Sequence, residues 1–318
     1  MSYHLGVLMD PISSINPKKD STLAMMQAAR EKGWTVSVFT QSDLSVEDGT
    51  VMIRSDTVDI YQEPDHWYDI LSSSMQEASA FDAILMRKDP PFDMEYIYTT
   101  YLLEMIEKSG VPVLNRPGSI RDCNEKLFAL TFPECCPPHI VSRDPASLKA
   151  FHAKHNDVIY KPLDGMGGSS IFRATPAEHN LSVIIETLTA YGQVQTMAQR
   201  YIPEIVAGDT RILLINGEPV PYGLARVPQK GETRGNLAAG GSAVGRELND
   251  RDLFIANQVG PVLKEKGLYF VGIDVIGDYL TEINVTCPTC VRELNVAFDL
   301  DIAMDYMNFI ESEILQPK

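Results

Sequence analysis

The segment Asp164–Phe172, with the sequence DGMGGSSIF, has the composition of a loop that could hold phosphate groups. Its glycines permit positive φ angles and let backbone N–H groups approach phosphate oxygens closely. Lys161 lies just before the loop, at the end of an expected strand, where its ammonium group could contact nucleotide phosphates. A plain hairpin turn would have the same glycines, so the loop alone is a weak signal.

A second group of residues has the chemistry of a metal site. Glu282 and Asn284 are two positions apart in an expected strand, so their side chains point to the same face. A hairpin turn near Gly277 would bring Asp274 opposite them, within ~5 Å. Buried carboxylates without partners are costly, and Mg²⁺ held by oxygen ligands and nucleotide phosphates would account for them. The alternative is an exposed sheet face with ordinary charges.

Three arginines lie between these two groups in the sequence: Arg211, Arg226 and Arg234. In an acidic chain they could bind the anionic groups of a substrate, although any one of them alone could be an ordinary surface residue. Arg234 belongs to a glycine-rich segment, residues 228–245, with few apolar side chains. This segment could be a disordered linker. Its Arg and Glu residues favour a loop that closes over bound substrate and excludes water.

The whole chain limits the classes of partner. It has 318 residues, enough for about two domains, and a net charge of −16. This charge argues against a nucleic-acid or anionic-membrane partner, because both require a broad basic surface. No segment approaches the ~20 apolar residues of a membrane span, and the N-terminus lacks the features of a signal peptide. We therefore expect a cytoplasmic protein whose mature chain begins where the sequence does.

The five cysteines do not suggest a secreted disulfide framework. Cys287 and Cys290 form a CxxC motif, which could indicate a redox pair or half of a zinc site. The motif lies close to the chain end, and no histidine pair follows it at a finger-like spacing. Reduced cytoplasmic thiols are the favoured interpretation.

Strands and helices alternate in the first part of the chain, which predicts a parallel α/β sheet. The expected elements are strands at 5–10, 35–40, 81–87 and 111–115, with helices at 22–31 and 96–108. Ligands of such sheets bind at the carboxyl ends of the strands, so Asp10, Ser13 and Arg87 are candidates for substrate contact. The turn-forming segment 115–122 is interpreted as a domain junction.

The remainder of the chain predicts an α+β fold with antiparallel hairpins. The expected strands are 157–162, 169–174 and 194–202, followed by hairpins at 209–226 and 269–285, with helices at 177–191, 250–266 and the C-terminus. Asn216-Gly217 is a strong signal for the two-residue turn of the first hairpin. The predicted domains are residues 1–122 and 123–318, and the second would include a lid subdomain at about 130–200 and a flexible loop at 228–245.

These motifs, in this order, resemble the ATP-grasp ligases, and within them the bacterial glutathione synthetases. The similarity covers nearly the whole chain and rests on NEKL, VIYKPLDGMGGSSIF, QRYI, GDTR, GETRGNLAAGG and TEINVTCPT, together with LGVLMDPI and RKDPPFD near the N-terminus. The resemblance implies an ATP-grasp fold preceded by a parallel α/β domain. It also implies ATP-dependent ligation of γ-glutamylcysteine and glycine through an acyl phosphate, and a homotetramer.

The resemblance also implies residue roles. Contacts to ATP are implied for Lys126, Lys161, Gly165, Met166, Gly167, Gly168, Gln199, Arg200, Tyr201, Ile202 and Asp209. Two Mg²⁺ ions, replaceable by Mn²⁺, are implied at Asp274, Glu282 and Asn284. Contacts to the γ-phosphoryl group and to the peptide are implied for Arg211, Arg226 and Arg234. Further substrate contacts are implied for Asp10, Ser13, Arg87, Thr286, Cys287 and Thr289.

The sequence departs from the family pattern at two positions. Arg200 stands where ATP-grasp enzymes more often have an acid, which matters little if the backbone reads the adenine base. Cys287 stands where serine is usual, and its thiol is the larger and weaker donor. Two alternatives remain open: another ATP-grasp ligase, such as a D-alanine–D-alanine or glutamate ligase, and a nucleotide-binding regulator without ligase activity.

Overall fold

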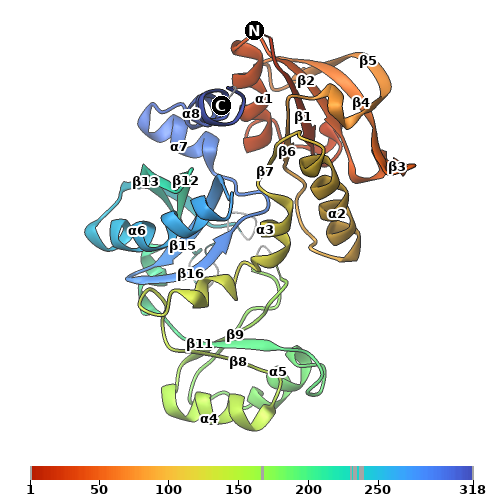
Figure 1. Cartoon of the computed structure of the whole chain (residues 1–318). Helices are drawn as coiled ribbons and strands as arrows, with labels where there is room; N and C mark the ends of the chain where they lie inside the picture. Colours follow the sequence, from red (N-terminus) through yellow and green to blue (C-terminus); the bar gives the residue numbers. More distant parts are fainter. Residues whose placement is uncertain (1, 166–167, 230, 232–234, 236–239, 317–318) are drawn as a thin grey trace.

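The computed structural model describes residues 2–165, 168–229, 231, 235 and 240–316. These residues form three β-sheets, with helices packed against them. Figure 1 shows the sheet that contains β1 at the top, the sheet that contains β15 and β16 in the middle, and the sheet that contains β8, β9 and β11 below. No helix in the described part of the chain is both long enough and apolar enough to cross a lipid bilayer.

The first sheet contains the four parallel strands that the sequence predicted. They are β1 (His4–Leu8), β2 (Thr35–Phe39), β6 (Ala83–Met86) and β7 (Val113–Leu114), adjacent in the order β2-β1-β6-β7. Helix α1 (Ser21–Glu31) shares one hydrophobic core with this sheet, and α2 (Met94–Lys108) shares another. Burial on both faces explains why these strands are continuous apolar runs. Asp20 caps α1, because its Oδ1 accepts a hydrogen bond from Leu23 N at 2.6 Å.

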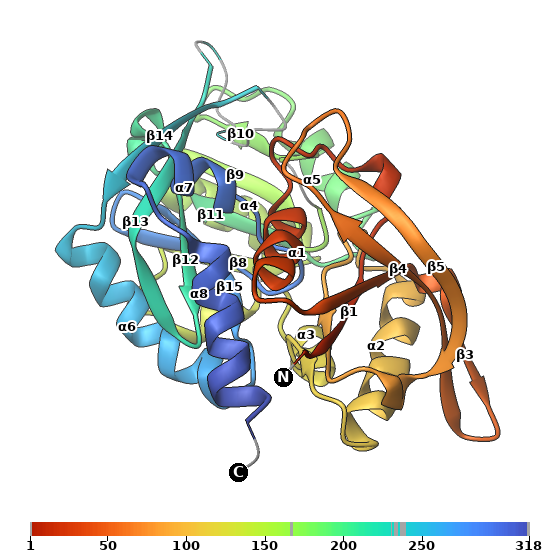
Figure 2. The ribbon, with the colours of Figure 1, turned by 90° about the horizontal axis from the view of Figure 1, so that it is seen from above.

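The sequence predicted the parallel strands of this sheet, and the sheet is larger than predicted. Three antiparallel strands extend it: β3 (Leu44–Glu47), β4 (Thr50–Ile60) and β5 (Tyr68–Glu77). β4 pairs with β2, β3 and β5, so the sheet is mixed. Figure 2 shows β4 and β5 as a ribbon at one edge of the molecule. Nearly all of β5 is exposed on both faces. It therefore lacks the alternation of apolar and polar residues that marks a half-buried strand.

The segment 115–122 was expected to consist of turns, but it contains helix α3 (Pro117–Asp122). Proline is favoured at the first helical position because its missing N–H has no partner there in any case. Asn115, just before the helix, is buried and fastens the first sheet to the third. Its Nδ2 donates to the carbonyl oxygens of Phe270 and Val285, both at 2.8 Å, and its Oδ1 accepts from Phe270 N at 2.9 Å.

The second sheet is a separate layer with its own small core. Its strands are β8 (His139–Ser142), β9 (Val158–Pro162), β10 (Phe172–Ala174) and β11 (Thr196–Arg200), in the order β10-β9-β11-β8. Helices α4 (Pro145–His155) and α5 (Leu181–Leu188) pack on it, and α5 is shorter than the predicted 177–191. β9 and β10 form the predicted antiparallel pair around the glycine-rich loop.

The third sheet contains the two predicted hairpins. Its strands are β12 (Asp209–Ile215), β13 (Glu218–Val227), β14 (Ser242–Glu247), β15 (Phe270–Ile276) and β16 (Tyr279–Asn284), in the order β14-β13-β12-β15-β16. Asn216 and Gly217 have φ angles of 51° and 83°, as their two-residue turn requires. Helix α6 (Asp250–Glu265) packs against this sheet. β14 was not predicted, and it occupies the end of the segment 228–245 that was expected to be a loop.

The C-terminus forms two helices rather than one, α7 (Val291–Phe298) and α8 (Ile302–Phe309), and a π-helical turn, Ile310–Ile314, continues α8. Both helices pack against α1, so the two ends of the chain lie close together (Figures 1 and 2). Short 3-10 helices occur at Ile12–Ser14, Gln41–Asp43, Ala78–Ala80, Phe128–Thr131 and Pro203–Ala207.

Candidate active site

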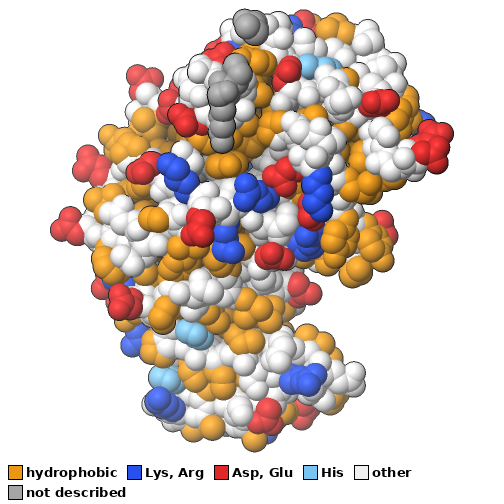
Figure 3. All heavy atoms as spheres, viewed as in Figure 1, with side chains coloured by type: hydrophobic (Ala, Val, Ile, Leu, Met, Phe, Trp, Pro, Cys, Tyr) orange, Lys and Arg blue, Asp and Glu red, His pale blue; other side chains and the backbone are white. Residues whose placement is uncertain are grey.

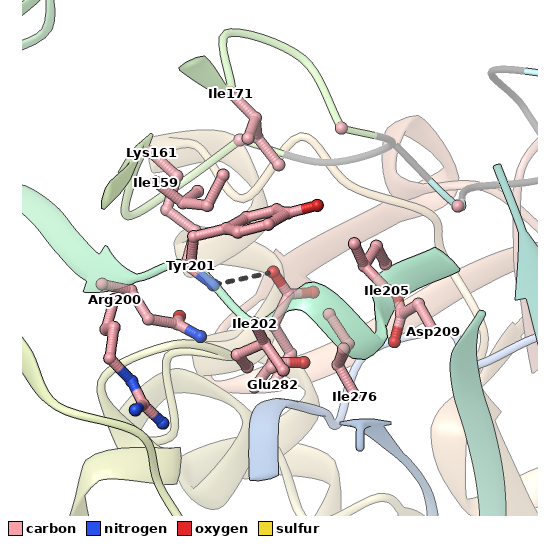
Figure 4. Close-up of a pocket in the computed structure, with 15 residues that line it drawn as sticks. Ile159, Lys161, Ile171, Arg200, Tyr201, Ile202, Ile205, Asp209, Ile276 and Glu282 are labelled. Atoms are coloured by element: carbon pink, nitrogen blue, oxygen red, sulfur yellow. Dashed lines mark ion pairs between the residues drawn. The ribbon is translucent and has the colours of Figure 1, made fainter. Parts of the chain in front are cut away.

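A cavity lies between the second and third sheets. Figure 3 shows that the molecule is hollowed on one side between the lower layer and the remainder, with Lys and Arg side chains gathered above the hollow. The cavity is lined by Ile159, Lys161, Gly165, Gly168, Ile171, Gln199, Arg200, Tyr201, Ile202, Ile205, Asp209, Gly235, Ile276, Thr281 and Glu282. Its walls are thus largely apolar, and charged groups project from particular positions (Figure 4). An apolar pocket with a few charged groups at particular positions is typical of a small-molecule site.

Two lysines converge on one carboxylate of the cavity. Lys161 Nζ is 3.7 Å from Glu282 Oε1, as the dashed line in Figure 4 marks, and Lys126 Nζ is 3.6 Å from the same oxygen. Lys126 also donates to the carbonyl oxygen of Gly165 at 2.9 Å and forms an ion pair with Glu125. The structure therefore brings two predicted lysines, Lys161 and Lys126, close to the carboxylate of Glu282. The start of the glycine-rich loop lies beside them.

The two lysines differ in their electrostatic environment. Burial lowers the pKa of Lys161, and only part of this effect is offset by the negative charge of Glu282. Burial also opposes the charge on Lys126, but Glu282 and Glu125 raise its pKa. Glu282 therefore stabilises the charged form of Lys161 only in part. The phosphates of a nucleotide would stabilise that charged form further.

The predicted metal residues lie on one face of the β15–β16 hairpin. Asp274 is directly opposite Glu282, and Asn284 is opposite Gly272 on the same face. Asn284 Nδ2 donates to Asp274 Oδ2 at 3.1 Å. Two carboxylates and one amide oxygen have the chemistry that Mg²⁺ prefers. Among the described residues, no group of three or more His, Cys, Asp or Glu side chains could hold a metal by itself. Of the three, Glu282 lines the cavity, so they fit a metal only if a bound nucleotide supplied further ligands.

Asp274 is also the centre of a buried ion-pair network. Arg211 Nε and Nη2 are 2.5 Å and 2.9 Å from its two oxygens, and Arg226 Nη2 is 2.9 Å from Oδ2. Arg226 Nη2 is also 2.6 Å from Asp209 Oδ2. Burial opposes ionisation of Asp274, but the two guanidinium groups hold its pKa below the usual range. Two of the three arginines expected to steady the γ-phosphoryl group thus lie beside Asp274, a predicted metal residue, and both are paired with acids in this structure.

The expected hinge, residues 199–202, forms the floor of the cavity at the end of β11. The Arg200 side chain points away from the cavity in Figure 4, and its Nη2 donates to the Tyr279 hydroxyl at 2.9 Å. The side chain at this position is therefore not directed at a base in the cavity. Ile159, Ile202 and Ile276 supply apolar surface around the hinge instead.

Three predicted residues, Met166, Gly167 and Arg234, lie outside the described residues, as do eight of the 18 residues of the segment 228–245. The remaining glycines of the loop have steric reasons to be glycine. A Cβ at Gly165 would lie 2.8 Å from Pro162 Cγ, and Gly168 has a φ of 78°. The loop as described cannot accommodate other residues at these positions without strain.

The candidate substrate residues fall into two places. Arg87 is buried and joins the first sheet to the turn after β16, because its Nη2 donates to the Pro288 carbonyl oxygen at 2.9 Å and its own carbonyl accepts from Cys287 Sγ at 3.2 Å. Thr286 and Thr289 lie on the same turn. Asp10 and Ser13 line a different cavity beside β4 and β5. Asp10 forms an ion pair with Lys88 at 3.0 Å.

All five cysteines are free thiols. Cys287 and Cys290 lie at the start of α7, and burial raises the pKa of both thiols. Reactive cysteines have a lowered pKa. This environment agrees with inert, reduced thiols better than with a redox pair.

Sequence reasoning missed Glu125. This residue lies in the turn after α3, beside Lys126, and its backbone carbonyl accepts from Ile283 N of β16 at 2.8 Å. Burial raises the pKa of Glu125 to about 7, and the negative charge of Glu282 acts in the same direction. A glutamate in a turn is normally exposed, so no pattern in the sequence identified it. Its adjacency to Lys126 was the only available signal.

Comparison with known proteins agrees with this geometry. The family model described as "Prokaryotic glutathione synthetase, N-terminal domain" matches residues 3–121, and "Prokaryotic glutathione synthetase, ATP-grasp domain" matches residues 125–299. The glutathione synthetase of Pseudomonas putida is 56% identical over 314 residues, which cover 99% of each chain. That of Vibrio vulnificus is 55% identical over 314 residues, again 99% of each chain.

Solved structures show the same fold at low sequence identity. D-cycloserine synthetase DcsG superposes with a TM-score of 0.69 at 16% identity, over 98% of this chain and 100% of its own. The ATP-grasp ligase PsnB, solved with its minimal precursor, Mg and ADP, superposes with a TM-score of 0.62 at 17% identity, over 97% of each chain. These likenesses establish the ATP-grasp fold, as predicted.

Proposed function

Because the chain belongs to the prokaryotic glutathione synthetase family, we propose that it joins γ-glutamylcysteine to glycine at the cavity between the second and third sheets. The chain is an ATP-dependent ligase, and ligases of this fold use a divalent metal. The observation that carries the assignment to this cavity is the meeting of Lys126, Lys161 and Glu282 at the charged end of an apolar slot.

The reaction has two steps. A C-terminal carboxylate oxygen of γ-glutamylcysteine attacks the γ-phosphorus of ATP, and the bond from that phosphorus to the β–γ bridging oxygen breaks. ADP leaves with the electron pair and an acyl phosphate remains. The glycine nitrogen, having lost a proton, then attacks the acyl carbon, and the C–O bond to phosphate breaks. The protein contributes position and opposite charge rather than a nucleophile.

Side chains in different parts of the cavity would contribute to different parts of this reaction. Lys161 and Lys126 neutralise phosphate charge, because they already lie against the carboxylate of Glu282 and the glycine-rich loop. The backbone of 199–202 and the surrounding isoleucines hold the adenine base. Arg211 and Arg226 stabilise negative charge on the transferred phosphoryl group once the phosphates of the nucleotide compete with Asp274 for the two guanidinium groups.

Asp274, Glu282 and Asn284 would hold Mg²⁺, in two ions, with Mn²⁺ as a substitute. When bound, the metal neutralises phosphate charge and polarises the γ-phosphoryl group. A cytoplasmic location, the homotetramer and the boundary between domains near residue 122 remain predictions.

A single-turnover experiment with ATP, γ-glutamylcysteine and glycine, each omitted in turn, tests the proposal. We expect ADP to form from ATP and γ-glutamylcysteine alone, and the tripeptide to form only when glycine is added. D-alanine should not replace γ-glutamylcysteine or glycine. ADP formation from D-alanine, with none from γ-glutamylcysteine, would instead indicate a D-alanine–D-alanine ligase.

A further inference from the structure

Arg246 connects three elements of the third sheet and has no role in the account above. Its guanidinium group forms a two-atom ion pair with Asp252 at the start of α6, with Nη1 2.6 Å from Oδ2 and Nη2 3.0 Å from Oδ1. Nε and Nη2 also donate to the hydroxyl oxygen of Thr210 on β12, at 3.3 Å and 3.2 Å. Arg246 itself belongs to β14, so one side chain joins β14, β12 and α6.

A glycine on the intervening strand allows this contact. β13 lies between β14 and β12, and Gly223 of β13 is directly opposite Arg246. A Cβ at Gly223 would lie 2.7 Å from Thr210 Cγ2, so a larger residue there would displace Thr210. Asp252 is completely buried and also accepts a hydrogen bond from Asn249 N at 2.9 Å. The position of the guanidinium group is therefore set by close contacts on the side of Thr210 and on the side of Asp252.

Thr210 lies between two residues of the charged network at the cavity. Side chains alternate along a strand, so Asp209 and Arg211 point to the face of the sheet opposite Thr210. On that face Arg211 pairs with Asp274, and Arg226 pairs with Asp209 at 2.6 Å. The hydrogen bonds from Arg246 thus hold this end of β12 from the face that lies away from the network.

The exact position of this strand end matters for phosphoryl transfer. A guanidinium group stabilises the transferred phosphoryl group only if its donors already point at the developing charge, and small displacements are costly. A cluster that only stabilised the fold would need the ion pair of Arg246 with Asp252, but not the donation to Thr210. We propose that Arg246 is a positioning residue: through Thr210 it fixes the backbone of β12, and with it the guanidinium group of Arg211. This inference rests on the role of Arg211 in the proposed function.

Thr210→Val tests the inference with little change in packing. The substitution removes the hydroxyl group, keeps the shape of the side chain and leaves the ion pair of Arg246 with Asp252 in place. We expect the single-turnover rate of ADP formation from ATP and γ-glutamylcysteine, at saturating substrate, to fall about tenfold. The KM for ATP should change by less than about twofold, because only a transition-state interaction is lost. The urea denaturation midpoint should stay near wild type, and Thr210→Ser, which keeps the hydroxyl group, should recover most of the rate.

The N-terminal region offers a matched control. The buried hydroxyl group of Thr100 on α2 accepts a hydrogen bond from Arg121 Nη1 at 3.2 Å, and Arg121 Nη2 pairs with Glu104 at 2.8 Å. This is the same arrangement of threonine, arginine and carboxylate, and none of its three residues lines the nucleotide cavity. Thr100→Val should therefore leave the rate of ADP formation unchanged. An equal loss of rate in Thr100→Val and Thr210→Val would overturn the inference, because any lost buried hydroxyl group would then have the same effect.

A double-mutant cycle shows whether Thr210 acts through Arg211. Arg211→Lys keeps the charge but loses the planar group that must be positioned. In this background, Thr210→Val should slow ADP formation by less than about twofold, since effects that pass through one residue are not additive. Arg246→Lys is the second variant, and it applies even if Thr210→Val does not fold. It keeps a positive charge beside Asp252 but lacks the donors that reach Thr210, so we expect the same loss of about tenfold.

The outcomes separate this inference from the function on which it rests. Wild-type rates in both Thr210→Val and Arg246→Lys, or a loss in Thr210→Val that is the same with Arg and with Lys at position 211, overturn the positioning role while the ligase assignment stands. A wild-type chain that forms no ADP from ATP and γ-glutamylcysteine overturns the proposed function and this inference with it.

Discussion

The two walls of the nucleotide cavity hold their charges in different ways. On the third sheet, Arg211 and Arg226 contact Asp274 and Asp209 at 2.5–2.9 Å inside the protein. On the wall formed by β9 and the turn after α3, Lys126 forms a close ion pair with Glu125, but both Lys161 and Lys126 approach Glu282 only to 3.6–3.7 Å. These lysine distances exceed an ordinary hydrogen bond.

This difference separates stability from nucleotide binding. A buried pair with bidentate geometry is costly to break, because removal of one partner leaves the other charged and unpaired. Lys161, which is 3.7 Å from Glu282, can move to a phosphate without breaking such a pair. We call the side with Arg211 and Arg226 the arginine wall and the side with Lys161 and Lys126 the lysine wall. Substitutions on the arginine wall should mainly lower the free energy of unfolding. Substitutions on the lysine wall should mainly lower the affinity for ATP.

Glu282 joins the two walls, so its substitution should have the largest effect on activity. Glu282→Gln removes a carboxylate from the proposed metal site and the shared partner of both lysines. We expect ligation to fall by at least about a hundredfold, with little change in melting temperature because its contacts are long. Glu218→Gln, an exposed carboxylate on β13, serves as control. Near-wild-type activity in Glu282→Gln would remove the metal assignment.

On the arginine wall, Arg211→Met should mainly destabilise the fold. It leaves Asp274 buried with one guanidinium partner instead of two, and breaking a buried pair costs about 3–5 kcal/mol. Urea denaturation of the unliganded protein measures this loss. The double variant Arg211→Met/Asp274→Asn should recover part of it, because no uncompensated acid remains. A single variant as stable as wild type would contradict the contrast between the walls.

Lys161→Met should have the opposite result. Burial already lowers the pKa of Lys161, so an apolar side chain of similar length should leave stability unchanged or improve it. The KM for ATP should rise by about tenfold or more, since a phosphate contact is lost. Steady-state kinetics and the same urea series test both points. If Lys161→Met is destabilised as strongly as Arg211→Met, the two walls do not differ.

The sequence predicted the hairpins of the third sheet but not the partners of their charges. Asn216-Gly217 identified the turn of β12–β13, and the spacing of Glu282 and Asn284 identified their common face. The pair between Arg211 and Asp274 joins residues 63 positions apart and exists because β12 lies beside β15 in that register. Strand order in a sheet is a property of the fold, so no local pattern could reveal that pair.

The N-terminal region shows the same limit in another form. Its parallel strands were predictable because burial on both faces makes them apolar throughout. β5 was missed because its residues are exposed on both sides and its sequence includes three consecutive serines. Glu125 was missed because its burial arises from packing of the turn after α3 against β16.

The raised pKa of Glu125 predicts a pH dependence of stability on the lysine wall. Between its unfolded value of 4.5 and about 7, the folded state binds more protons than the unfolded state. The free energy of unfolding should therefore fall as pH rises through this window, by about 1 kcal/mol per pH unit from this group. Glu125→Gln cannot titrate, so its stability relative to wild type should increase from pH 5 to pH 7.5. A difference that is constant with pH would show that Glu125 titrates normally.

The smallest effect is expected at Arg200, which lies on the lysine side of the cavity but points away from it. Its Nη2 is bound to the Tyr279 hydroxyl at 2.9 Å, so Arg200→Met removes a contact outside the nucleotide site. We expect the KM for ATP to change by less than about threefold, because in the proposed site the backbone of 199–202 contacts the base and this side chain does not. Arg200→Glu, which restores the acid more common in ATP-grasp enzymes, should be equally neutral. Measurement of KM with ATP and GTP tests this: a change in preference between the two bases in either variant would show that the side chain contacts the base after all.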